Sequence, residues 1–83
     1  MSWQARRVVT LLTREGCHLC EQAKPVVAEI CSETGAELRE IDVDTDPQLR
    51  AEYGDRLPVF LVDGREHGYW RVEEDRLRAA LSA

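Results

Sequence analysis

Residues 8–20 read Val-Val-Thr-Leu-Leu-Thr-Arg-Glu-Gly-Cys-His-Leu-Cys, an apolar run followed by a turn and two cysteines three positions apart. The apolar run is typical of a strand buried on both faces of a parallel or mixed sheet. Cysteines at i and i+3 in a first helical turn lie on the same side of the helix, close enough to form a disulfide. The order of strand, cysteine pair and helix predicts a redox site, with half of a zinc site as the alternative.

The two cysteines are expected to play unequal roles. Cys17 stands at the predicted start of the helix, where unpaired N–H groups favour negative charge. For such thiols a pKa of about 4 to 7 is typical, and the thiolate is the form that attacks disulfides. Cys17 is therefore the predicted nucleophile, and Cys20, one turn further on, is predicted to resolve the mixed disulfide.

Size and charge limit the classes of protein to consider. The chain has 83 residues, which predicts a single domain over residues 1–83, and its hydrophobic fraction of 43% is ordinary for a globular protein. The formal net charge is −5 with acids and bases interleaved, which disfavours nucleic acid and anionic membranes as partners. No apolar run reaches the roughly 18 residues of a membrane span or has the form of a signal peptide, so we expect a cytoplasmic protein. A monomer is the default expectation for its oligomeric state.

The rest of the chain predicts alternating helices and strands. Apolar positions spaced by three and four predict an amphipathic helix from Leu19 to Gly35, kinked at Pro25. A short helix capped by Asp46 and a last helix from about residue 73 are also expected. The remaining strands are predicted over 37–43, 58–62 and 66–71, the last two joined by a turn at Asp63-Gly64.

With these elements in order, the chain resembles the thioredoxin fold, and within it the small glutaredoxin-like proteins. The resemblance covers nearly the whole length and rests on Cys17-His18-Leu19-Cys20, on Pro25 in the first helix and on Leu57-Pro58 before the third strand. It implies an α/β fold of order βαβαββα, with a four-stranded mixed sheet flanked by three helices. It also implies a cis Leu57–Pro58 bond facing the cysteines, which leaves the Leu57 backbone free to pair with an extended thiol substrate.

The departures from the resemblance concern the substrate. Glutaredoxins carry Pro-Tyr between the cysteines and Gly-Gly after the hairpin, where this chain has His18-Leu19 and Gly68-Tyr69. Tyr69 stands where the backbone would approach glutathione, and Trp70 beside it adds a bulky apolar side chain, which argues against the usual glutathione site. No cofactor is expected. The candidate substrates are a disulfide-containing protein or a small thiol, and the candidate electron donors are glutathione or a flavin-linked reductase.

Two cations near the cysteines have competing interpretations. As an imidazolium, His18 would stabilise the Cys17 thiolate and make the disulfide a stronger oxidant; otherwise it merely faces solvent. Arg14 also lies close in sequence, but Glu15 beside it offsets its field. We expect Arg14 to be an exposed arginine without a role.

Other candidate ligands favour structural roles. Cys31 lies about 16 Å along the helix from Cys20, too far for a disulfide, and is expected in the core. His67 is expected at a strand edge rather than in a metal site. Three aspartates stand at alternate positions, Asp42, Asp44 and Asp46. The sequence after them lacks the glycine and the glutamate that a calcium loop requires, so we expect these aspartates to end a strand and cap a helix.

Three functions remain for the cysteine pair. The first is a thiol–disulfide oxidoreductase. The second is a metal or iron–sulfur carrier, which needs a second chain or glutathione to complete four ligands because only two thiolates cluster. The third is a binding module that keeps the fold without redox chemistry, against which the retention of both cysteines argues.

Overall fold

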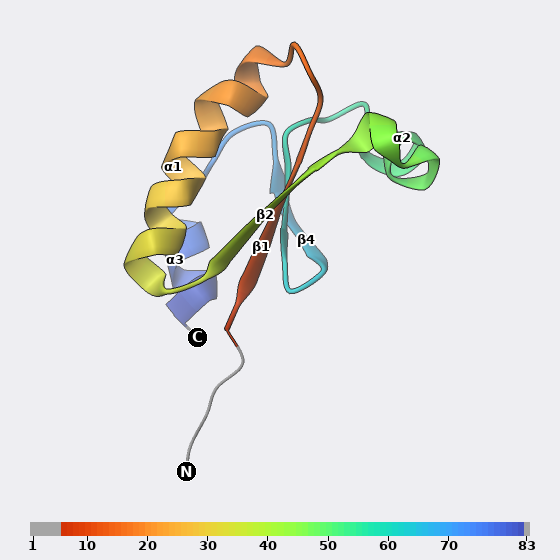
Figure 1. Ribbon diagram of the computed structural model, residues 1–83. Coiled ribbons are helices and arrows are strands. Elements are labelled where there is room, and N and C mark those ends of the chain that lie inside the picture. The colour runs from red at the N-terminus through yellow and green to blue at the C-terminus, as the bar shows by residue number, and fades with distance from the viewer. Residues whose placement is uncertain (1–5, 83) are drawn as a thin grey trace.

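The computed structural model describes residues 6–82 (Figure 1). The elements in chain order are β1 (Val8–Thr13), α1 (His18–Thr34), β2 (Glu37–Asp42), the 3-10 helix η1 (Val43–Thr45), α2 (Pro47–Tyr53), β3 (Val59–Val62), β4 (Arg65–Tyr69) and α3 (Glu74–Ser82). This order confirms the predicted thioredoxin-like α/β fold with three α-helices and four strands. No helix within this range is both long and apolar enough to cross a membrane.

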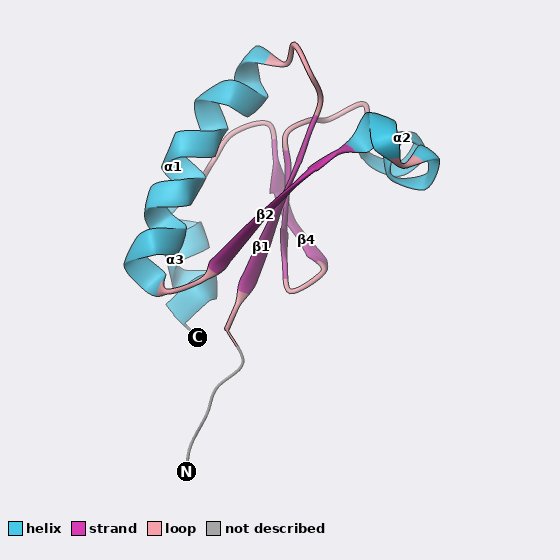
Figure 2. Cartoon of the chain, viewed as in Figure 1, coloured by secondary structure: helices cyan, strands magenta, loops and turns pink. Residues whose placement is uncertain are grey.

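The four strands, magenta in Figure 2, form one mixed sheet, and their order in it is β2-β1-β3-β4. β1 pairs with β2 in parallel and with β3 antiparallel, while β4 pairs antiparallel with β3. The register shifts between Phe60 and Leu61, so the hairpin is irregular there. β1 is thus hydrogen-bonded on both sides, and the cysteines that follow it start from the middle of the sheet.

Two hydrophobic cores cover the two faces of the sheet. Val9 and Leu11 of β1 point into the larger core, against α1 and α3, whereas Leu12 points into the smaller core beside α2. Figure 1 shows the same layers, with α1 and α3 on one side of the sheet and α2 on the other. β1 is buried on both faces of the sheet, as predicted for this apolar run.

The two ends of α1 follow from its sequence. Cys17 is the N-cap residue, and its side chain accepts a hydrogen bond from the backbone N–H of Cys20. Gly35 ends the helix in the left-handed region at φ 78°, as predicted, and its N–H bonds the Cys31 carbonyl. Pro25 lies inside the helix, and the kink there stays a prediction.

Some predicted strand boundaries were wrong by one or two residues. β2 ends at Asp42 rather than residue 43, because the Asp42 carboxylate accepts the Asp44 N–H at 2.8 Å and starts η1. β3 begins at Val59, one residue after Pro58, which has no N–H for the ladder. β4 ends at Tyr69 because Trp70 turns into the left-handed region, with φ 71°.

Candidate functional site

Cys17 and Cys20 form a disulfide at the start of α1, with their Cα atoms 5.2 Å apart. The loop from β1 reaches them through Gly16, whose φ of 81° requires a residue free to enter the left-handed region. The Cys17 N–H donates to the Arg14 carbonyl at 3.2 Å and closes the turn. The strand, turn and helix therefore bring together the two cysteines that the sequence analysis singled out.

The two sulfur atoms have different surroundings. Cys20 is 3% exposed, whereas Cys17 is only partly buried. The backbone N–H of Cys20 donates to Cys17 Sγ at 3.2 Å, a hydrogen bond that would also stabilise a Cys17 thiolate. An external sulfur atom thus meets Cys17 first, and Cys20 lies within disulfide distance behind it.

The two residues between the cysteines, His18 and Leu19, are both exposed. Within residues 6–82 His18 has no hydrogen bond or ion pair with another side chain, so its effect on Cys17 stays a prediction. Leu19 leaves 48% of its surface in solvent although it begins an amphipathic helix. The first turn of α1 therefore exposes apolar as well as polar surface beside the disulfide.

Leu57 and Pro58 lie at the same end of the sheet as the cysteines. The pairing of Leu12 with Val59 places the start of β3 beside the end of β1, from which the cysteine loop leaves. The Leu57–Pro58 bond is cis, Pro58 is fully buried, and its carbonyl accepts the Trp70 N–H at 2.8 Å. In the described range neither the N–H nor the carbonyl of Leu57 has a hydrogen-bond partner.

A hollow of about 380 Å³, lined mostly by polar and charged residues, adjoins the buried cysteine, and its walls include Cys20, Lys24 and Glu40. The Lys24 ammonium lies 2.9 Å from the Glu40 carboxylate, which raises the pKa of Lys24. The Thr13 hydroxyl donates to the same carboxylate at 3.4 Å. Sequence reasoning missed Glu40 because only the parallel pairing of β2 with β1 brings it to this side of the cysteines.

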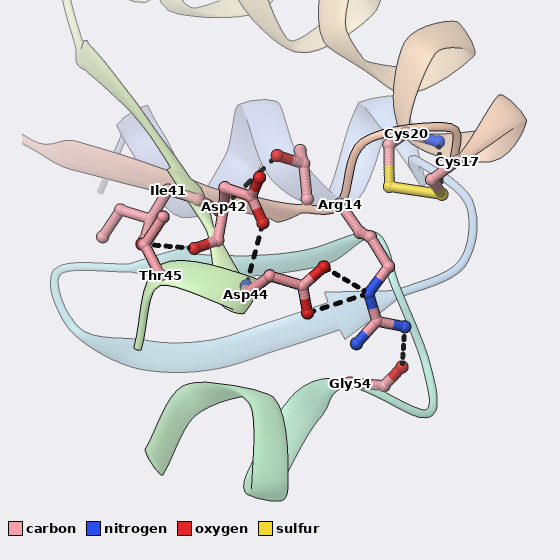
Figure 3. Close-up of polar contacts among 9 residues, drawn as sticks. Arg14, Cys17, Cys20, Ile41, Asp42, Asp44, Thr45 and Gly54 are labelled. Atoms are coloured by element: carbon pink, nitrogen blue, oxygen red, sulfur yellow. Dashed lines mark hydrogen bonds and ion pairs between the residues drawn. A yellow bond between two sulfur atoms is a disulfide. The ribbon is translucent and has the colours of Figure 1, made fainter. Parts of the chain in front are cut away.

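Arg14 is half-buried rather than exposed, and its side chain has polar partners that the sequence did not predict. Its guanidinium lies 3.2 Å from the Asp44 carboxylate and also donates to the Gly54 carbonyl at 3.5 Å. Figure 3 shows this side chain directed toward Asp44 and Gly54 and away from the two sulfur atoms. Arg14 therefore ties the cysteine loop to the end of α2 instead of acting on the thiols.

The other candidate ligands have structural positions. Cys31 is buried in the larger core, as predicted, and burial raises the pKa of its thiol. His67 lies half-buried on the edge strand β4, and burial lowers its pKa. Asp42 caps η1 and Asp46 caps α2, as expected. Among residues 6–82 no three His, Cys, Asp or Glu side chains form a group that could hold a metal ion.

Comparisons with known proteins agree with this geometry. The family model described as "Glutaredoxin-like domain (DUF836)" matches residues 8–82. An uncharacterized protein of Mycobacterium tuberculosis is 52% identical over 83 residues, which cover 94% of this chain and 86% of that protein.

Two solved structures are also similar. The solution structure of a Nitrosomonas europaea protein superposes with a TM-score of 0.82 at 30% identity and covers 99% of this chain and 100% of its own. A mutant thioredoxin from Halobacterium salinarum superposes with a TM-score of 0.68 at 28% identity and covers 90% of this chain and 71% of its own.

Proposed function

Because the chain belongs to the glutaredoxin-like domain family (DUF836), we propose that it is a thiol–disulfide oxidoreductase whose redox centre is the Cys17–Cys20 pair. The observation that carries the proposal is the disulfide between these residues at the start of α1. The unequal exposure of the two cysteines supports unequal roles, with Cys17 as the nucleophile and Cys20 as the resolving cysteine.

The reaction starts from the reduced pair. The Cys17 thiol gives its proton to solvent, and the thiolate attacks one sulfur of a substrate disulfide. The substrate S–S bond breaks, its second sulfur leaves with the electron pair and takes up a proton, and a mixed disulfide joins Cys17 to the substrate.

The Cys20 thiol then loses its proton and attacks Cys17 Sγ. The mixed disulfide breaks, the remaining substrate sulfur leaves as a thiolate that is protonated, and the Cys17–Cys20 disulfide forms. Two electrons have passed from the pair to the substrate. A dithiol-equivalent donor, two molecules of glutathione or a flavin-linked reductase, returns two electrons and two protons.

Three features of the chain support these steps. The Cys20 N–H on Cys17 Sγ and the unpaired N–H groups of the first turn of α1 stabilise the attacking thiolate. We further propose that the exposed His18, if it acts as an imidazolium, would add to this stabilisation and make the disulfide a stronger oxidant. The unpaired backbone of Leu57, held in place by the buried Pro58, binds the extended substrate segment as an added strand would.

The proposed partners follow from the same chemistry. A disulfide-containing protein or a small thiol is the substrate, and no resident cofactor is needed because the sulfur atoms carry the electrons. The interleaved charges and the net charge of −5 argue against nucleic acid and anionic membranes as partners. We propose that the protein acts as a monomer in the cytoplasm.

The first experiment equilibrates the protein in a series of glutathione redox buffers, then alkylates it and measures the intact mass. We expect an internal disulfide that titrates with the buffer. Cys20→Ser should accumulate a mixed disulfide on Cys17, because nothing resolves it, and Cys17→Ser should form no adduct.

Cys31→Ala is the matched control, since it removes the cysteine of the core and should titrate as the unmodified protein does. If both Cys17 and Cys20 stay alkylatable at every buffer ratio, the redox proposal is wrong. If Cys20→Ser collects no adduct, the mechanism with two cysteines is wrong.

A further inference from the structure

The exposed apolar surface of residues 6–82 gathers at the redox end of the molecule. Its large exposed side chains are Leu19, Tyr69 and Trp70, with 48%, 46% and 54% of their surfaces in solvent. Leu19 stands between the cysteines. Tyr69 ends β4 opposite Val59, and Val59 in turn lies opposite Leu12 near the end of β1.

Leu19 and Trp70 both line one groove of about 260 Å³. The apolar side chains that line it are Leu19, Ala23, Val26, Trp70 and Val72. Two charged residues also line this Leu19–Trp70 groove, Arg71 and Glu74, and their opposite signs leave it without net charge. The groove is therefore apolar and electrically balanced, and it begins on the helical turn that carries the disulfide.

The fold does not account for a tryptophan at position 70. Its φ of 71° is unfavourable for a residue with a side chain and costs a glycine nothing. The ring is mostly in solvent, so it adds little to the core. It is nonetheless held in place, because the Trp70 N–H bonds the Pro58 carbonyl and the ring packs edge-on against Tyr69, with centroids 5.0 Å apart. Since the exposed Trp70 ring contributes little to folding, we expect its main favourable contact to be with another molecule.

This inference rests on the proposed reaction, which indicates what kind of molecule binds in the groove. A polypeptide segment whose sulfur reaches Cys17 extends past the first turn of α1, where Leu19 lines the groove. Glutathione is a charged tripeptide without a large apolar side chain, and the groove offers it one cation offset by one anion. An extended polypeptide presents side chains on alternating sides, so a residue near its cysteine can enter the groove.

We propose that the substrate is a polypeptide disulfide with an apolar residue beside its cysteine, and that Leu19 and Trp70 select it by binding that residue. The segment runs from the unpaired Leu57 backbone across Cys17 to the groove. The apolar side chain leaves water as the mixed disulfide forms, which favours such a segment over glutathione.

The test uses short peptides whose single cysteine is blocked as a mixed disulfide with a chromogenic thiol. Two peptides differ only beside the cysteine, with leucine in one and aspartate in the other. Each single-turnover rate is divided by the rate at which the same protein reduces bis(2-hydroxyethyl) disulfide. We expect the unmodified protein to prefer the leucine peptide by about tenfold, the effect of burying one such side chain.

Trp70→Gly removes the ring and relieves the backbone, so it keeps the fold, and it should reduce the preference to near one. Leu19→Gln should reduce it partly. The control is Gln48→Ala, at an exposed position on α2 outside the groove, which should keep the full preference.

The outcomes separate the two proposals. Failure of the unmodified protein to reduce bis(2-hydroxyethyl) disulfide would contradict the redox function itself. Reduction of that disulfide without preference between the peptides would overturn the substrate class alone. The proposed substrate class would also be overturned if Trp70→Gly keeps the preference for the leucine peptide, or if a glutathione mixed disulfide reacts faster than that peptide.

Discussion

Cys17 and Cys20 are the same residue type, yet the fold gives their sulfur atoms different surroundings. One residue caps the helix and is partly exposed, while the other lies a turn deeper and is 3% exposed. This difference could be predicted from the sequence, because it depends only on where the helix starts. The partners of Arg14 could not, since Asp44 and Gly54 lie 30 and 40 positions away and approach only when α2 packs on the sheet.

Asp63 supplies a prediction about acid stability. The Val8 N–H and the Arg7 guanidinium lower the pKa of the Asp63 carboxyl below its usual 3.8. A carboxyl with a lowered folded-state pKa adds stability that is present above its unfolded pKa and is lost as the pH falls through the folded one. Asp63→Asn should therefore unfold at lower urea concentration than the unmodified protein at pH 7, and at a similar concentration near pH 2.

Asparagine is the suitable replacement because it tolerates the φ of 51° at this position. Arg7→Gln removes the cation but keeps the larger cause, the hydrogen bond from the Val8 N–H, so it should lose less stability at pH 7 than Asp63→Asn does. If the urea midpoints of Asp63→Asn and the unmodified protein differ equally at both pH values, the charge of Asp63 is not the cause of the lost stability.

The local sequence predicted the positions of most helices and strands, but the exact residue at which each one ends depends on contacts with other parts of the fold. The apolar spacing and Gly35 predicted α1 closely, and Asp46 with Pro47 predicted the start of α2. The last residues of β2 and β4 were misplaced because the Asp42 side chain starts η1 directly after β2 and Trp70 enters the left-handed region after β4. A pattern of apolar residues carries no signal for such a turn when its central residues are neither glycine nor proline.

Gly35 supplies the prediction for α1. Its φ of 78° lies in the left-handed region, and a Cβ built there meets no atom within 4 Å. The cost of Gly35→Ala is therefore conformational rather than steric, about 1 kcal/mol of unfolding free energy. Urea denaturation measures it.

Gly35→Asn is the matched comparison, and it should lose less stability because asparagine enters this region more readily. Equal stability of the alanine variant and the unmodified protein would show that the helix can end in another conformation.

For the whole molecule, the larger core links the sheet, α1 and α3 into one cooperative unit. Leu77 of α3 is 1% exposed and packs in the same cluster as Cys31 of α1. In the Cys17→Ser/Cys20→Ser background Cys31 is the remaining thiol, and alkylation reaches it only when this core opens. Its labelling rate therefore reports the stability of the molecule.

Leu77→Ala should remove about 2 to 5 kcal/mol and raise the labelling rate of Cys31 by at least about tenfold. Intact mass against time of exposure to iodoacetamide gives the rate. Ala79→Ser, at an exposed position on the same helix, should leave it nearly unchanged. Equal rates for Leu77→Ala and the unmodified background would mean that Cys31 is reached by a local motion.

The direction of the chain through this fold has a practical consequence. β1 begins and α3 ends at the end of the molecule opposite the first turn of α1 (Figure 1). A cargo, a second enzyme or an electrode can be joined ahead of β1 or beyond α3. It would then lie at the end of the molecule far from the sulfur atoms. The protein can therefore be attached to a surface or a partner ahead of β1 or beyond α3, and its disulfide stays accessible to substrates.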